Sequence, residues 1–370
     1  MGDNKSLRKA NNAKQDEFYT QLSDIEQELR HYKEDFRGKT VFCNCDDPYE
    51  SNFFKYFAIN FNHLGLKKLI ATCFDTSPIA GQEIDLFNFQ EAENYENRAY
   101  KIEITEITDL NNDGAVDMAD VKTLLKNDKN TFTILKGNGD FRSEECVKLL
   151  MQADIIVTNP PFSLFREYIS LLEQYNKKYI VIGNTNALTY KEIFGLFKDN
   201  KIRTGYTNFN VGMFFSVPNT CVQYHKIVDG KKYVRVSTSC WFTNLSVSKH
   251  SDFITLYKKY NKDYYPKYQN FDAINVNKYT DIPCDYFGYI GVPITFLDKY
   301  NPEQFLIIGL GISNSGLSFG VAPYVMEHKK YRKEVQHKGA VDGDLYLLDS
   351  NGHPDVPYAR IIIKRKEGSL

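Results

Sequence analysis

The sequence shows no excess of charge of either sign, because its 370 residues include 46 Lys and Arg against 47 Asp and Glu. A surface for nucleic acid, if present, must therefore be a local basic patch. The sequence also has no apolar run of about 20 residues, the length of a membrane-spanning helix. Its polar beginning lacks the apolar core of a secretory signal. These absences predict a cytoplasmic protein without a membrane partner.

Cysteine and tryptophan are scarce, with seven and one residues, whereas Tyr and Phe contribute 26 each. An odd number of irregularly spaced cysteines argues against a disulfide framework and for reduced thiols. Cys43 and Cys45 lack the partner spacing of a zinc site, so we expect them to be buried near a strand end. The length predicts two lobes and a large core.

The most informative stretch begins with Ile155-Ile156-Val157, an uncharged β-branched run typical of a buried parallel strand. Asn159-Pro160-Pro161-Phe162 then ends the strand, because proline has no N–H to donate. The spacing of apolar residues after Ser163 predicts a helix. The sequence thus places a stiff turn at the carboxyl end of a strand, where open α/β sheets bind ligands.

This turn offers two hydrogen-bond acceptors, the side-chain oxygen of Asn159 and the carbonyl oxygen of Pro160. Together they suit an exocyclic amine, which has two hydrogens to donate. Phe162 provides a flat face on which a base can stack. The alternative is a strand-ending turn with a core phenylalanine, and the complete constellation favours the first interpretation.

Two earlier strands end in polar residues. Thr40–Cys43 is the first, followed by Asn44, Asp46 and Asp47 in a loop without glycine. Residues 68–75 form the second, and its final Asp75 could accept both ribose hydroxyls of an adenosine. We expect these side chains at the same sheet edge as Asn159.

Later strands complete the predicted sheet. Residues 133–136 are the third strand, with Asp140 and Phe141 in the loop after it. Residues 211–218 and 238–244 are predicted to pair within the same sheet. The basic segment between them contains Lys226, Lys231, Lys232 and Arg235 and forms a hairpin tip. Such a tip is usually a solvated turn, and here it would lie at the ligand edge of the sheet.

Residues 109–120 match a twelve-residue EF-hand calcium loop, with Gly114 at its sixth position. This insertion predicts a structural calcium site, and the alternative is a solvated acidic loop. The last position is Asp instead of the usual Glu, which weakens the match. The ligands would be Asp109, Asn111, Asp113, the carbonyl of Ala115, Asp117 and Asp120.

From about residue 245 the sequence changes to short predicted strands with many tyrosines and lysines. Residues 257–268 interleave the two residue types, and further cations lie at 329–333 and 364–366. Such a patch suits phosphates, although tyrosines packed beneath surface lysines would look the same. We expect residues 1–15 to be flexible, residues 16–244 to form one domain and residues 245–370 to form a second region.

Taken in order, these motifs resemble the EcoRI-type adenine-specific DNA methyltransferases, above all through Cys43-Asn44-Cys45-Asp46-Asp47-Pro48 and the Asn-Pro-Pro-Phe turn. The resemblance implies an α/β fold, with a Rossmann-like class I methyltransferase sheet and a C-terminal mixed α+β target-recognition region. It implies S-adenosylmethionine as cofactor and duplex DNA as partner. Adenine-N6 methylation would use Asn159, Pro160, Pro161 and Phe162. Cofactor contacts would come from Phe18, Tyr19, Thr20, Asn44, Asp46, Asp47, Asp75, Asp140, Phe141 and Asn159.

The residues leave three alternatives open. The same turn occurs in enzymes that methylate RNA or a protein glutamine. A DNA-binding protein without catalysis is the second alternative, and a calcium-dependent interaction module is the third. For the favoured reading we expect a monomer of bacterial or phage type, associated with the nucleoid. It would be either the modification enzyme of a restriction–modification system or an orphan methyltransferase. In the first case a cognate restriction endonuclease would be its partner without a stable complex.

Overall fold

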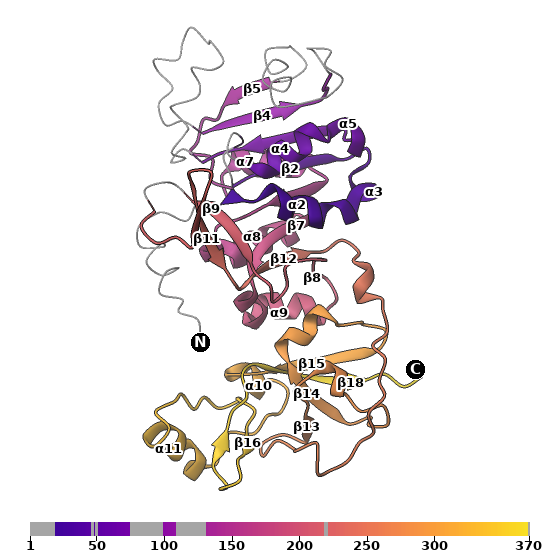
Figure 1. The fold of residues 1–370 in the computed structure, drawn as a ribbon, viewed down its shortest axis with the longest axis vertical. Coiled ribbons are helices and arrows are strands. Elements are labelled where there is room, and N and C mark those ends of the chain that lie inside the picture. The colour runs from indigo at the N-terminus through magenta and orange to yellow at the C-terminus, as the bar shows by residue number, and fades with distance from the viewer. Residues whose placement is uncertain are drawn as a thin grey trace. The chain divides into compact units, whose positions relative to one another are not determined.

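The computed structural model describes residues 19–45, 48, 51–74, 99–108, 131–217 and 221–368. The fold is mixed α/β with large mixed sheets (Figure 1). The described residues form two compact units, the first within Met1–Thr185 and Thr204–Leu245 and the second within Asn186–Arg203 and Ser246–Leu370. No helix in the described part of the chain is long and apolar enough to cross a membrane.

An eight-stranded sheet organises the first unit. Four of its strands, β3, β2, β6 and β7, lie side by side and run parallel. Residues of β2 and β6 are buried throughout, as the apolar runs in the sequence predict. In sheet order the strands are β5 (Thr131–Ile134), β4 (Tyr100–Ile104), β3 (Lys68–Thr72), β2 (Thr40–Cys43), β6 (Ile155–Thr158), β7 (Lys178–Asn184), β12 (Ser239–Thr243) and β8 (Arg203–Thr204).

Helices connect the parallel strands. Ser51 caps the helix after β2 by accepting from the backbone N–H of Phe54, and Ser143 caps the helix before β6 in the same way. The helical segments of this unit are α2 (Leu22–Leu29), η1 (Arg30–Tyr32), α3 (Lys33–Phe36), α4 (Asn52–Ile59), α5 (Phe61–Leu64), α7 (Glu144–Gln152), η4 (Phe162–Leu164) and α8 (Phe165–Gln174).

Two strands of this sheet, β4 and the two-residue β8, have no counterpart among the strands expected from the sequence. β4 runs antiparallel between β3 and β5, so the expected third strand is shifted to residues 131–134 and to the sheet edge. Glu103 of β4 bonds to Lys68 at 2.6 Å and to Lys101 at 3.0 Å. These ion pairs neutralise a carboxylate on the half-buried face of β4. β4 is antiparallel to both β3 and β5, so β5 runs in the same direction as β3. The two strands therefore end at the same edge of the sheet.

The first unit also contains a four-stranded sheet in the order β1 (Tyr19–Thr20), β9 (Met213–Val217), β11 (Lys231–Val236) and β10 (Lys226–Val228). The expected pairing of residues 211–218 with 238–244 is therefore wrong. β9 pairs with β11, whereas β12 pairs antiparallel with β7 in the larger sheet. The basic segment between β9 and β12 supplies two further strands, which separate the two segments that were expected to pair.

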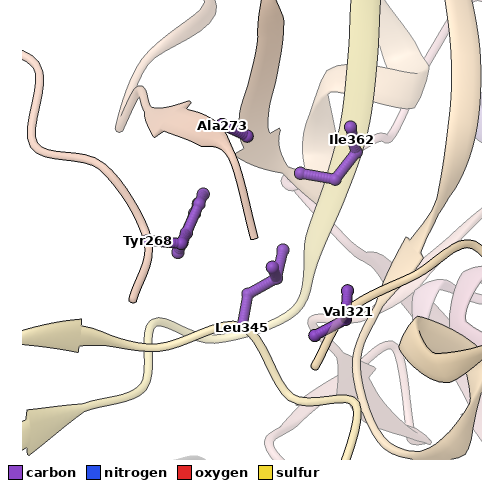
Figure 2. Packing of buried hydrophobic residues seen from close by; sticks show 5 residues of the cluster. All are labelled: Tyr268, Ala273, Val321, Leu345 and Ile362. Carbon is purple, nitrogen blue, oxygen red and sulfur yellow. The ribbon is translucent and has the colours of Figure 1, made fainter. Parts of the chain in front are cut away.

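A second mixed sheet, β13-β14-β18-β15, forms the centre of the second unit. Figure 2 shows its packed core, in which Tyr268, Ala273, Val321, Leu345 and Ile362 are all buried. The elements of this unit are α9 (Lys191–Lys198), η6 (Ser248–His250), β13 (Ala273–Asn275), η7 (Tyr279–Asp281), β14 (Tyr289–Pro293), η8 (Ile294–Asp298), β15 (Phe305–Gly311), α10 (Asn314–Leu317), α11 (Met326–Glu334), β16 (Leu347–Leu348), β17 (Pro354–Asp355) and β18 (Arg360–Arg365). The short η5 (Thr185–Thr189) spans the boundary between the units.

Candidate active site

The ends of β2 and β6 bring two polar loops together. The strands pair in parallel, with Val41 opposite Ile155 and Phe42 opposite Ile156, so the residues after both strands share one sheet edge. At that edge the hydroxyl of Thr158 donates to the carbonyl oxygen of Asn44. This hydrogen bond ties the loop after β2 directly to the strand that enters the Asn-Pro-Pro-Phe turn.

The turn itself begins in a buried position. Asn159 is 7% exposed and Pro160 is buried, whereas Pro161 and Phe162 are partly exposed. The ring of Phe162 meets that of Phe215 on β9 edge to face, with centroids 6.3 Å apart. The turn therefore begins with two buried residues, and a partly accessible aromatic ring follows two residues after Pro160.

The loop after β2 takes a left-handed bend without a glycine. Cys45 has φ +76°, a conformation that costs an ordinary residue roughly 1–2 kcal/mol. Asn44 before it is buried, and its side-chain oxygen accepts from the phenol of Tyr168 on α8. Burial is the main cause that raises the pKa of Tyr168 well above its usual value, so the phenol stays a donor. Asp46 and Asp47 lie outside the described residues.

Gly139 brings the loop after β5 against the end of β3. Its φ is +80°, and a Cβ on this residue would collide with the carbonyl oxygen of Cys73. Phe141 is thereby placed next to α8, where its ring lies edge-on to Tyr168 with centroids 5.0 Å apart. Asp140 and Phe141 thus come to the expected sheet edge. Asp75 lies outside the described residues.

Arg142 links this loop to α8, the helix after the Asn-Pro-Pro-Phe turn. Its guanidinium bonds Asp140 at 2.7 Å and Glu167 of α8 at 2.9 Å, and lies 5.2 Å from the ring centroid of Phe141. Hydrogen bonds from the Arg142 side chain are the main cause that lowers the pKa of Asp140. Neither Arg142 nor Tyr168 was singled out from the sequence. The bridge from Arg142 to Glu167 spans 25 positions, and the bond from Tyr168 to Asn44 spans 124.

The N-terminal segment reaches the same region through the smaller sheet. Thr20 of β1 pairs with Phe215, the residue that contacts Phe162. Its carbonyl oxygen accepts from the side chain of Asn52, the first residue of α4, at 2.6 Å. Tyr19 and Thr20 are both buried, and Phe18 lies outside the described residues.

No group of His, Cys, Asp or Glu side chains in the described part of the chain could hold a metal ion. The calcium ligands expected at Asp109, Asn111, Asp113, Ala115, Asp117 and Asp120 all lie outside the described residues. The calcium site therefore stays a prediction from the spacing of those residues.

Comparison with known proteins identifies the class. The family described as "Adenine-specific methyltransferase EcoRI" matches residues 6–366. The chain is 43% identical over 372 residues to "Type II methyltransferase M.EcoRI" of Escherichia coli, covering 98% of this chain and 97% of that protein. It is 38% identical over 310 residues to "Type II methyltransferase M.MpnI" of Mycoplasma pneumoniae, covering 82% and 84%. No solved structure matches.

An Asn-Pro-Pro-Phe turn at the end of a parallel strand, together with these matches, makes the protein a DNA adenine methyltransferase. The chain belongs to the EcoRI-type adenine-specific methyltransferase family. Membership implies S-adenosylmethionine as methyl donor and duplex DNA as substrate.

The strand ends contain groups that fit such a cofactor. The hydroxyls of Thr20 and of Thr72, the last residue of β3, are buried and have no hydrogen-bond partner within the described part of the chain. A buried polar group without a partner is costly unless a ligand or water satisfies it. Polar groups of a nucleoside or an amino acid could do so.

Proposed function

We propose that the chain methylates the N6 atom of an adenine at a specific site of duplex DNA, with the adenine rotated out of the helix. The hydrogen bond between Thr158 and the Asn44 carbonyl carries this proposal. It joins the loop that would hold the cofactor to the turn that would hold the adenine. Donor and acceptor of the methyl group would then meet at a single sheet edge, where effective concentration alone contributes much of the rate.

Asn159 and Pro160 would bind the target amine. The side-chain oxygen of Asn159 and the carbonyl oxygen of Pro160 accept its two hydrogens, and Phe162 stacks on the purine. These bonds draw N6 toward tetrahedral geometry and free its lone pair for attack on the methyl group. As the N–C bond forms, the S–C bond breaks and its electron pair stays on sulfur, and a proton then leaves N6 to water. Bound S-adenosylmethionine supplies the electrophilic methyl group.

The remaining residues at the sheet edge would hold the cofactor. Asn44, Asp46 and Asp47 would bind from the loop after β2, and Asp75 would accept from the ribose hydroxyls. The segment Phe18-Tyr19-Thr20 would contact the methionine end. Asp140 and Phe141 would receive the adenine ring of the cofactor. The ion pair with Arg142 leaves Asp140 further lone pairs for this purpose.

We assign a Rossmann-like class I methyltransferase domain to residues 16–244, after a flexible tail of residues 1–15. The four adjacent parallel strands support this assignment. Residues 245–370 would be the target-recognition region of mixed α+β structure. Exposed aromatics in that region suit contacts with DNA, since Tyr257 is 67% and Tyr264 80% exposed.

The biological setting follows from the relatives, whose names describe Type II methyltransferases. We infer that the chain protects DNA within a restriction–modification system. It would act as a monomer in the cytoplasm, associated with the nucleoid, and a cognate endonuclease would read the same site without forming a stable complex. Calcium bound by residues 109–120 would have a structural role.

A labelling experiment tests the proposal against its alternatives. The protein is incubated with methyl-labelled S-adenosylmethionine and either unmethylated plasmid, total RNA or a protein extract, and the products are digested completely. We expect label in N6-methyldeoxyadenosine from the plasmid alone. Label in ribonucleosides or in methylglutamine would favour the other chemistries of the same turn, and binding of plasmid without transfer would favour a non-catalytic DNA-binding protein.

A further inference from the structure

The hairpin of β10 and β11 is an exposed ribbon that the proposed reaction does not use. Every residue from 222 to 231 is exposed. The turn at its tip consists of Asp229 and Gly230, with φ +49° and +75°. These values and this residue pair are typical of a type I′ turn, whose twist matches that of the flanking strands. The tip therefore belongs to a regular hairpin and not to an irregular loop (Figure 1).

The hairpin is basic in a chain of nearly neutral charge. Residues 221–236 contain four cations, Lys226, Lys231, Lys232 and Arg235, and a single carboxylate at Asp229. Two of the lysines are held over aromatic rings. Lys226 Nζ lies 4.3 Å from the ring centroid of Phe214, and Lys232 Nζ lies 5.1 Å from that of Tyr224. Such a concentration of cations suits backbone phosphates.

Apolar side chains accompany these cations on the exposed ribbon. Ile227 is 53% and Val228 is 43% exposed, and they occupy adjacent positions before the turn. An exposed β-branched side chain between lysines contributes little to folding. Proteins that distort duplex DNA use such side chains as wedges between base steps.

Strand register places these two side chains on opposite faces. Phe215 pairs with Val234, and Ile227 pairs with Lys232, which lies two residues before Val234 in β11. Residues two apart and residues directly opposite share a face. Ile227 therefore lies on the face of Phe215, which contacts Phe162, whereas Val228 lies on the other face. The distance between neighbouring strands and the rise per residue along a strand together place Ile227 about 12 Å from Phe215.

We propose that Ile227 enters the base stack of duplex DNA and fills the space left by the flipped adenine. This inference rests on the proposed function, because it requires an adenine rotated toward the catalytic turn. A two-stranded ribbon fits the major groove, which is about 12 Å wide. Lysines on both faces of the hairpin contact phosphates on the two sides of that groove. The wedge stabilises the open helix and so favours the flipped state of the target.

Alanine substitution of Ile227 and Val228 forms a matched pair, because both are exposed β-branched residues of one strand. The methylated site is first located on an unmethylated plasmid. A short duplex is then made with 2-aminopurine at the target position, since its fluorescence rises when it leaves the stack. We expect Ile227→Ala to lower this rise. On the same duplex with adenine at the target position, the variant should lower kcat about ten- to a hundredfold, because the wedge no longer offsets the cost of unstacking. Val228→Ala should change kcat less than about threefold.

A duplex with the target adenine opposite an abasic site completes the test, because an unpaired base costs less to flip. On this duplex Ile227→Ala should recover to within about threefold of the wild-type kcat. Full activity of Ile227→Ala on the paired duplex would overturn the proposal that Ile227 enters the base stack. An equal loss of kcat in Val228→Ala would do the same. Either result would leave the proposed function intact. A wild-type protein that transfers no methyl group to DNA would overturn both.

Discussion

The phenol of Tyr168 donates to the side-chain oxygen of Asn44, so the helix after the Asn-Pro-Pro-Phe turn is bonded to the loop after β2. Both residues are buried. The ring of Tyr168 also packs against Phe141 from the loop after β5. One tyrosine thus connects three segments of the site that are far apart in the sequence.

Loss of this hydroxyl should weaken cofactor binding more than catalysis. In Tyr168→Phe the buried oxygen of Asn44 loses its donor, which costs about 1–3 kcal/mol. We expect the Kd for S-adenosylmethionine to rise about tenfold, with kcat at saturation reduced less than about threefold. Calorimetric titration measures the Kd directly.

Tyr179→Phe is the matched control, because this buried tyrosine on β7 bonds Glu173, outside the candidate site, at 2.9 Å. It should lower thermal stability without changing the Kd for S-adenosylmethionine. An unchanged Kd in Tyr168→Phe would show that the position of Asn44 does not depend on this bond.

Asn159→Ala should separate catalysis from cofactor binding. It removes the side-chain acceptor that we assign to the adenine amine, and loss of one such group in other enzymes costs roughly 10²–10³ in kcat. The Kd for S-adenosylmethionine should change little, since the other cofactor contacts persist. Methyl transfer to plasmid and calorimetry on the same preparation measure the two quantities. Activity close to that of the wild type would refute the assignment of Asn159.

Gly139 and Gly137 form a natural pair for testing the loop after β5. A Cβ at Gly139 would meet backbone at the end of β3 and would stand on a residue with φ +80°, whereas a Cβ at Gly137 meets nothing within 4 Å. We expect Gly139→Ala to destabilise the protein by about 2–4 kcal/mol and to weaken cofactor binding. Gly137→Ala should have neither effect. Chemical denaturation and calorimetry of both variants check this, and equal stabilities would contradict the close approach.

The sequence indicated most of the parallel sheet because its strands are short apolar runs with polar residues at their ends. The ends of β2 and β6 lie side by side, as expected. Asp140 and Phe141 lie in the loop after β5, and Phe141 packs against Tyr168 of α8. The antiparallel β4 was missed although residues 100–104 alternate apolar and charged positions, the period-two pattern of a half-buried strand. Its place between β3 and β5 was not predictable, because Glu103 pairs with Lys68 of β3, 35 positions earlier in the chain. Nothing local to the sequence signals such a partner.

The conformation of the loop after β2 was not predictable for a different reason. Absence of glycine removed the usual signal for a left-handed turn, yet Cys45 adopts that conformation. The neighbouring bonds of Asn44 to Thr158 and Tyr168 hold the loop in place and offset the cost. Tyr168 itself looked like one more residue of an apolar helix face, because its polar partner is distant in the sequence.

The ion pair between Arg142 and Asp140 should make the stability of the protein depend on pH in the acidic range. The carboxyl of Asp140 has its pKa lowered from 3.8, chiefly by hydrogen bonds from Arg142. A carboxyl with a lowered pKa in the folded state stabilises the fold above its unfolded pKa, and this contribution is lost as the pH falls through the folded value. The wild type should therefore be more stable than Arg142→Gln from neutral pH down to about pH 4, with the difference shrinking below that.

Because Arg142 is about half exposed, we expect the difference to be only about 0.5–1 kcal/mol. Denaturant unfolding of both proteins between pH 3 and 7 measures it. Lys148→Gln is the control, since its bridge to Glu144 lies on the exposed surface of α7 and is not part of the site. This control should leave the Kd for S-adenosylmethionine unchanged, whereas Arg142→Gln should raise it, because Asp140 and α8 lose their common partner. A stability difference that grows toward acid would contradict the assigned role of Asp140.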